Sequence, residues 1–189
     1  MTIAKTETGS PVLAIEEKGW NLAENLVIAR YQMFSQVYFH RVRRVYDYHI
    51  YRAAKCVLEK NGLQGVYPPP TQINDYLSFD DWKINAALHE GLGDKHGEII
   101  LTRKHFKCID KTPDNPSEKE EQKIKAKAQE WEAKGVEVYL DEASTSWYKL
   151  DKDIFIEEND LAQPLSEKSS IVKAMNEKSR LQRLYVEQT

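Results

Sequence analysis

The chain has 189 residues, of which 41% are hydrophobic and 10% aromatic, and its formal net charge is −3 at pH 7. This length fits one domain, or one domain with a small satellite, and the hydrophobic content excludes a chain that is disordered throughout. The two cysteines, Cys56 and Cys108, form no CxxC pair, so the sequence indicates neither a zinc cage nor a disulfide framework.

The charges are unevenly distributed. Residues 19–60 hold seven Lys or Arg against three Asp or Glu, whereas residues 111–160 hold eight against fourteen. A basic segment in an acidic chain favours a local anion site over direct nucleic-acid binding. The sequence shows neither the apolar core of a signal peptide nor a run of about 18 apolar residues, so we expect a cytoplasmic protein that does not contact membranes.

Three segments are predicted in chain order. Residues 1–16 are expected to be a flexible N-terminal segment, residues 17–104 a helical region, and residues 105–189 an α+β subdomain. Asn21 to Glu24 has the side chains of a capping box, and no Gly or Pro interrupts the sequence from there to Glu59. We therefore expect one long helix, or two nearly collinear helices, followed by short helices near residues 79–90 and 96–104.

Apolar side chains recur at helical spacing along the long helix and predict a stripe that faces the core. They are Leu22, Leu26, Met33, Val37, Val45 and Ala53.

The last segment alternates strand-like and helix-like patterns. In order these are a strand at 106–109, a charged helix from Ser117 to Gly135, strands at 136–140 and 154–156, a helix at 169–178 and a strand at 183–186. This β-α-β-β-α-β order is that of a small ferredoxin-like subdomain, and the predicted fold class is α+β.

Arg30 and Tyr38 are the candidate ligand-binding residues of the long helix. At 100° per residue they lie about 80° apart, whereas Tyr38 and His40 lie about 160° apart and cannot share one small site. A guanidinium donates two parallel hydrogen bonds to a phosphate, and a tyrosine can pack on a sugar or base. Periodicity alone favours a simpler interpretation, in which the arginines form a solvated face and Tyr38 is a core residue.

The sequence also resembles a known superfamily. Arg30, Tyr38, His40 and Arg41, with Lys18 before them, resemble a segment of the HD-domain deoxynucleoside triphosphate triphosphohydrolases, which include the SAM and HD domain-containing enzymes. Residues 100–107 and 179–186 are similar to later stretches of that family, so the resemblance covers most of the chain from about Glu17.

This resemblance implies roles for particular residues. Arg30 would contact the triphosphate of a substrate nucleotide, and Tyr38 would pack on its sugar. The family has a glutamine next to this tyrosine, where this chain has Phe39. The positions that would bind a regulatory nucleotide at subunit interfaces are Lys18, His40, Arg41, Arg103 and Lys107.

The superfamily's metal motif is missing from this sequence. Members hydrolyse phosphate esters at a divalent metal held by a histidine, a His-Asp dipeptide and a distant aspartate. None of the five histidines here is followed by aspartate. We therefore expect no catalytic or metal-ligating residue and no cofactor in this chain, which would have no phosphohydrolase activity alone.

Three functions remain open. The chain could be the substrate-side and assembly portion of an HD phosphohydrolase, which binds a nucleoside triphosphate and needs a separate chain for the metal centre. It could instead be a non-catalytic nucleotide-sensing module, or it could serve oligomerisation alone. In each case the apolar stripe at Leu26, Met33 and Val37 needs cover, so we expect a homo-oligomer or a complex with a chain that carries the HD motif.

Overall fold

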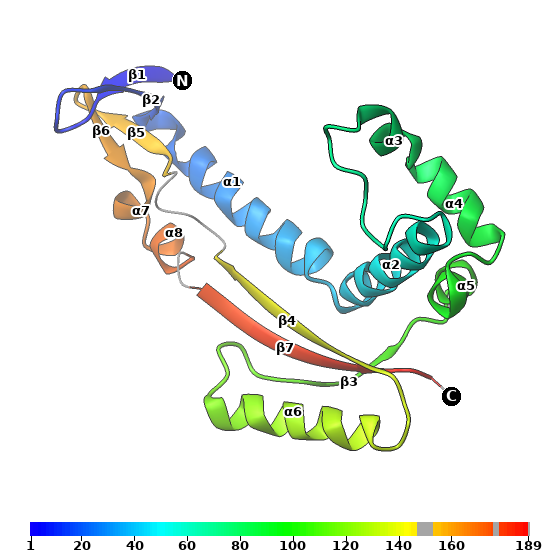
Figure 1. The fold of residues 1–189 in the computed structure, drawn as a ribbon. Helices are drawn as coiled ribbons and strands as arrows, with labels where there is room; N and C mark the ends of the chain where they lie inside the picture. Colours follow the sequence, from blue (N-terminus) through cyan, green and yellow to red (C-terminus); the bar gives the residue numbers. More distant parts are fainter. Residues whose placement is uncertain (147–152, 176–177, 189) are drawn as a thin grey trace. The chain divides into compact units, whose positions relative to one another are not determined.

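The computed structural model describes residues 1–146, 153–175 and 178–188, and the chain divides into two compact units (Figure 1). The first unit contains Met1–His40, Pro113–Ser117 and Glu142–Leu181, and the second contains Arg41–Thr112, Glu118–Asp141 and Gln182–Thr189. Each unit is thus assembled from three separate stretches of sequence. The predicted segments were contiguous, with boundaries after residues 16 and 104.

A small closed barrel forms one part of the first unit. Its strands are β1 (Thr2–Lys5), β2 (Pro11–Glu16), β5 (Phe155–Glu158) and β6 (Leu161–Pro164). β1 and β2 are antiparallel, β2 and β5 are parallel, and β5 and β6 are antiparallel. Three small side chains, Ala4, Ala14 and Ala162, form its buried core. Residues 1–16, expected to be flexible, therefore contain two of the four barrel strands.

Helices complete the first unit. They are η1 (Glu17–Gly19), α1 (Trp20–Met33), a π-helical turn labelled η2 (Phe34–Tyr38), α7 (Leu165–Lys168) and α8 (Ser170–Ala174). Ala23 and Val27 of α1 pack against Leu165 and Val172. The predicted capping box is wrong, because Gly19 is the N-cap of α1 and Glu24 instead accepts a hydrogen bond from the Ser169 hydroxyl.

The second unit has a helical part made of four helices. These are α2 (Arg41–Lys60), α3 (Ile73–Ser78), α4 (Asp81–His89) and α5 (Asp94–Thr102). Ala53 and Val57 of α2 form a core with Ala87 and Leu88 of α4. The carboxylate of Asp80 caps α4 by accepting the N–H of Lys83 at 2.8 Å, as expected for a helix that begins here.

A three-stranded sheet has the order β3 (Lys107–Lys111), β7 (Lys178–Val186) and β4 (Val138–Ser146). β3 and β7 are antiparallel, and α6 (Glu118–Glu132) packs on the sheet through Ile124, Ala128 and Leu184 (Figure 1). The α+β class is confirmed. The ferredoxin-like subdomain is not confirmed, because β5 pairs with β2 and β6 in the barrel instead of joining this sheet.

The predicted long helix is interrupted. The N–H of Phe39 donates to the carbonyl of Phe34 at 2.8 Å, a five-residue π-type bond, and α2 begins only at Arg41. In the part of the chain that the structure describes, no helix is long and apolar enough to cross a membrane.

The predicted stripe is buried only in α2. Val45 and Ala53 are buried, which confirms that part of the prediction. The α1 residues that contact the core are instead Ala23 and Val27. The remaining members of the predicted stripe are exposed: Leu22 by 73%, Leu26 by 63%, Met33 by 44% and Val37 by 53%.

Asp141 is the centre of a buried ionic network in the second unit. Its side chain is fully buried and accepts hydrogen bonds from the guanidinium of Arg44 on α2, with Nε at 3.0 and 3.2 Å from the two oxygens. Arg183 of β7 lies 3.4 Å away, and the Tyr139 hydroxyl donates at 3.1 Å. Asp141 therefore joins one helix and two strands through a single carboxylate.

Two buried histidines form a hydrogen-bonded chain in the same unit. His49 accepts the N–H of Phe106 on Nε2 at 3.3 Å, so its proton is on Nδ1, which donates to Nδ1 of His96 at 2.9 Å. Nε2 of His96 then carries a proton and faces the Glu137 carboxylate at 3.3 Å, outside good hydrogen-bond geometry. Burial, and then the neighbouring His96, lower the pKa of His49 to about 4, and burial also lowers the pKa of His96.

We predict that Asp141→Asn destabilises the second unit by about 3–5 kcal/mol, because it removes the buried charge that pairs with Arg44 and Arg183. Urea unfolding followed by circular dichroism measures this difference. Asp47→Asn is the control, since Asp47 pairs with Arg43 on the surface at 2.8 Å. That exposed pair should contribute less than about 1 kcal/mol. Equal effects of the two substitutions would contradict the role assigned to Asp141.

We predict that the free energy of unfolding falls as the pH falls from about 6.5 to 4, because the unfolded chain protonates His49 near its ordinary pKa of 6.5 and the folded chain does so only near 4. Above pH 6.5 this contribution is fully present. His49→Gln can still accept the Phe106 N–H but does not titrate, so its stability should change less over this range. The measurement is urea unfolding at several pH values, and identical pH profiles would count against the buried neutral histidine.

Candidate functional site

A row of side chains on the first unit brings together the two residues that the sequence singled out. Arg30 lies on α1, with Cζ 4.8 Å from the centre of the Phe34 ring. The rings of Phe34 and Tyr38 are 4.9 Å apart and tilted by 43°. Arg30 and Tyr38 thus contact the same aromatic ring from positions four residues to either side. We call this row the Phe34 row.

The Phe34 row is open to solvent. Arg30 is exposed, and 43% of the Tyr38 surface is accessible, so Tyr38 is not the core residue of the simpler interpretation. A guanidinium over an aromatic ring is attracted by the π-electrons of that ring, so Phe34 favours this position of the exposed Arg30 side chain. The arrangement can present hydrogen-bond donors to an anion beside an aromatic surface.

The π-helical turn at Phe34–Tyr38 sets the position of Tyr38 in this row. Single π turns within helices are frequent at functional sites. No local sequence pattern predicts this turn, because neither Gly nor Pro occurs near it. Sequence reasoning also missed Phe34, although an aromatic residue four positions from both Arg30 and Tyr38 was a readable signal.

The second unit contains a cavity of about 300 Å³ where α2 and β3 begin, which we call the α2–β3 cavity. Its residues are Arg41, Val42, Val45, His105, Phe106, Lys107, Cys108 and Tyr185. Arg41 opens α2 and Lys107 opens β3, so two cationic side chains border one cavity. The first turn of a helix also favours anions. The cavity is therefore suited to an anionic ligand.

Hydrogen bonds hold the walls of the α2–β3 cavity. The Tyr185 hydroxyl donates to the carbonyl of Arg41 at 2.8 Å and so anchors the first residue of α2 to β7. Nδ1 of His105 lies 2.8 Å from the carbonyl of Phe106, so this nitrogen carries the proton. Burial raises the pKa of the Cys108 thiol, which is therefore not a ready nucleophile at neutral pH.

The other residues proposed for regulatory nucleotide binding lie elsewhere. Lys18 is exposed in η1, His40 is exposed between the π turn and α2, and Arg103 is exposed at the end of α5 with a φ of +60°. Of the five predicted residues, the α2–β3 cavity gathers Arg41 and Lys107.

The described histidines do not fit a metal centre of the HD type. Both ring nitrogens of His49 are engaged, one by the Phe106 N–H and the other by His96. Across residues 1–146, 153–175 and 178–188, no three His, Cys, Asp or Glu side chains are grouped to hold a metal ion. The described residues therefore offer cationic and aromatic side chains, and no grouped metal ligands, at these two places.

Comparison with known families identifies the chain. The family described as "HD associated region" matches residues 2–186. The chain belongs to this family.

Two solved structures share the fold of this HD-associated region. A hypothetical protein from Aquifex aeolicus is 25% identical, with a TM-score of 0.74 over 98% of this chain and 46% of its own. A phosphohydrolase from Bacteroides thetaiotaomicron is 19% identical, with a TM-score of 0.64 over 93% of this chain and 52% of its own. The chain thus spans about half the length of each. No match was found among curated proteins.

Proposed function

We propose that this HD-associated region is the substrate-side and assembly portion of an HD-superfamily phosphohydrolase that acts on a (deoxy)nucleoside triphosphate. The divalent metal centre would be supplied from outside these residues, by a partner chain with the HD motif. The observation that carries this proposal is the Phe34 row, in which Arg30 and Tyr38 contact one ring.

In this proposal the Phe34 row binds and orients the nucleotide. The Arg30 guanidinium donates charged hydrogen bonds to the triphosphate while Phe34 holds its plane. Tyr38 packs on the sugar and can donate from its hydroxyl. Fixing the substrate in this way lowers the entropic cost of reaching the reactive geometry.

The exposed apolar side chains of α1 and η2 support an assembly role. Leu22, Leu26, Met33 and Val37 leave between 44% and 73% of their surfaces accessible, and an apolar stripe of this kind marks an interaction surface. The solved relatives are about twice as long as this chain, and one of them is a phosphohydrolase. A metal-bearing partner that packs on this stripe would lie along α1 and η2, the elements that carry Arg30 and Tyr38.

The α2–β3 cavity favours a second function, which is nucleotide sensing without catalysis. Arg41 and Lys107 supply positive charge, and Phe106 and Tyr185 supply aromatic walls. This combination fits a phosphorylated ligand with a planar base. Binding here would require neither a metal nor the Phe34 row.

We predict that Arg30→Ala weakens the binding of a deoxynucleoside triphosphate by about tenfold or more, because it removes charged hydrogen bonds to the phosphates. Isothermal titration calorimetry measures the dissociation constant. Arg43→Ala is the matched control, since Arg43 is an exposed arginine that pairs with Asp47. Unchanged affinity in the Arg30 variant would show that the Phe34 row is not the binding site.

The catalytic part of the proposal is tested separately, by an assay of phosphate release from the nucleotide. The chain with Mg²⁺ or Mn²⁺ should release no phosphate, and addition of a protein that carries the His-Asp motif should restore turnover. Metal-dependent turnover by this chain alone would refute the need for a partner.

We predict that Lys107→Ala weakens nucleotide binding to the α2–β3 cavity by about threefold to tenfold, since one charged contact contributes on the order of 1 kcal/mol at a partly exposed site. Calorimetry without metal ions is the measurement. Lys111→Ala is the control, because Lys111 is exposed on the same strand but does not line the cavity. Equal affinities would argue against nucleotide sensing at this cavity.

A further inference from the structure

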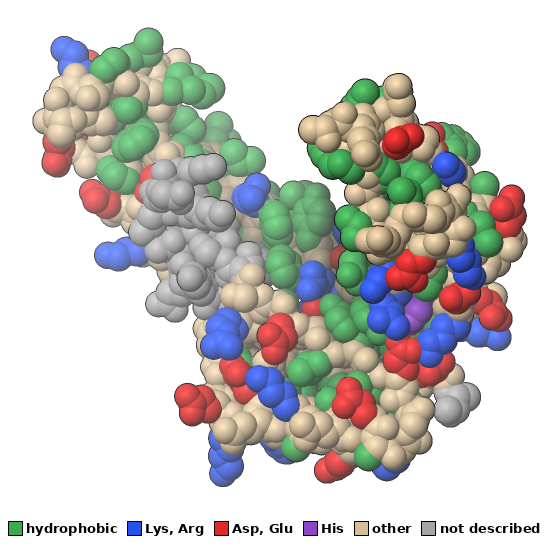
Figure 2. Space-filling model, viewed as in Figure 1, with side chains coloured by type: hydrophobic (Ala, Val, Ile, Leu, Met, Phe, Trp, Pro, Cys, Tyr) green, Lys and Arg blue, Asp and Glu red, His purple; other side chains and the backbone are tan. Residues whose placement is uncertain are grey.

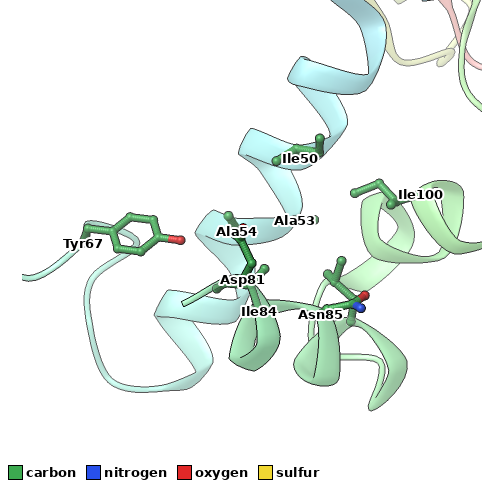
Figure 3. A pocket seen from close by; sticks show the side chains of 9 residues that line it. Ile50, Ala53, Ala54, Tyr67, Asp81, Ile84, Asn85 and Ile100 are labelled. Atoms are coloured by element: carbon green, nitrogen blue, oxygen red, sulfur yellow. The ribbon is translucent and has the colours of Figure 1, made fainter. Parts of the chain in front are cut away.

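A second cavity lies in the helical part of the second unit and is separate from both sites above. It has a volume of about 200 Å³. Its floor is apolar and comes from three helices: Ile50, Ala53 and Ala54 of α2, Ile84 and Leu88 of α4, and Ile100 of α5 (Figure 3).

Three polar side chains border this floor. Tyr67 contributes a hydroxyl, Asp81 a carboxylate and Asn85 an amide. Within the described ranges, none of the three makes an intramolecular hydrogen bond or ion pair. The neighbouring Asp80 is the residue that caps α4, so the Asp81 carboxylate is not needed for that cap. Burial, and then the charge of Asp81, raise the pKa of Tyr67, so its hydroxyl stays protonated and can donate.

The size of the cavity limits what it can hold. An apolar cavity of about 150 Å³ accommodates one benzene ring, whereas pockets for larger organic ligands measure about 300–1,000 Å³. A volume of about 200 Å³ therefore fits one branched aliphatic or aromatic side chain.

The surface around the cavity has the composition of a protein-binding site. Ile50 and Tyr67 line it and remain 50% and 42% exposed, and Trp82, which is 82% exposed, lies one helical turn from Asn85. Figure 2 shows further hydrophobic side chains at the surface over α3 and α4. Large exposed aromatic residues next to a pocket are typical of the energetic centres of protein interfaces.

The charge of this surface indicates the sign of the partner. Of the residues that line the cavity, Asp81 is the one with a charged side chain. Asp81 lies directly at the edge of the cavity. An acidic edge beside an apolar floor complements a partner with a positive charge next to an apolar anchor.

We propose that this cavity docks a segment of a protein partner that inserts one leucine- or phenylalanine-sized side chain and places an adjacent lysine or arginine against Asp81. Tyr67 and Asn85 then hydrogen-bond to the backbone of the inserted segment. The site does not depend on nucleotide binding or on the Phe34 row, so this proposal is tested independently of the proposed function.

The experiment uses three fluorescein-labelled 12-residue peptides that differ only at the two central positions: Leu-Arg, Ala-Arg and Leu-Glu. Fluorescence anisotropy with the full chain measures their affinities. The Leu-Arg peptide should bind at least about tenfold more tightly than the Ala-Arg peptide, since the anchor buries an apolar side chain. The Leu-Glu peptide should bind more weakly than the Leu-Arg peptide, because its charge faces Asp81.

Two variants of the chain locate the site. Asp81→Asn should weaken binding of the Leu-Arg peptide by about threefold to fivefold, because it removes one exposed ion pair. Ala54→Phe should fill the cavity and abolish the preference for the leucine anchor. Glu130→Gln, an equal change of charge on α6 outside the cavity, should have no effect, and circular dichroism confirms that each variant is folded.

Three results would overturn the proposal. Equal affinity for the three peptides would exclude a specific anchor. If Asp81→Asn left the affinity for the Leu-Arg peptide unchanged, Asp81 would be excluded as the residue that contacts the arginine of the peptide. Sedimentation showing a dimer that dissociates in Asp81→Asn would make a second copy of this chain the occupant.

Discussion

The buried carboxylate of Asp141 has to be neutralised, and this requirement connects the main elements of the second unit. An isolated buried charge is very costly, so α2 must bring Arg44 to it, and β7 must bring Arg183. Arg44 is one helical turn from Arg41, which is the first residue of α2 and lines the α2–β3 cavity. The position of α2 relative to β4 and β7, and therefore the shape of that cavity, depends on this charge balance.

The arginines of this HD-associated region illustrate how surroundings decide a role. Arg44 is satisfied inside the protein, whereas Arg30 lies on an aromatic ring in an exposed row. A guanidinium that already holds a buried carboxylate cannot serve an external phosphate without loss of stability. The sequence shows both simply as arginines of a basic segment, and only their partners separate a structural residue from a candidate ligand-binding residue.

Sequence reasoning succeeded where local patterns determine structure. The α+β class, the charged helix that stops before Gly135 and the core-facing Val45 and Ala53 all follow from local periodicity. The π turn was missed because no Gly or Pro marks the break in the helical pattern. The barrel was missed because its four short strands pair across about 140 residues, which no local pattern reveals. The Phe34 row was predicted only in part. Helical angles put Arg30 and Tyr38 on neighbouring faces, but they did not identify the Phe34 ring that lies between them.

The barrel also has a consequence for how the chain acquires its structure. β1 and β2 can pair with β5 and β6 only after the intervening sequence has been synthesised and its large loop closed, which costs chain entropy. The helices of residues 41–102, by contrast, make contacts that are near in sequence. We expect these helices to form first during translation. Until residues 155–164 have been synthesised, β1 and β2 lack their barrel partners and remain accessible to chaperones and proteases.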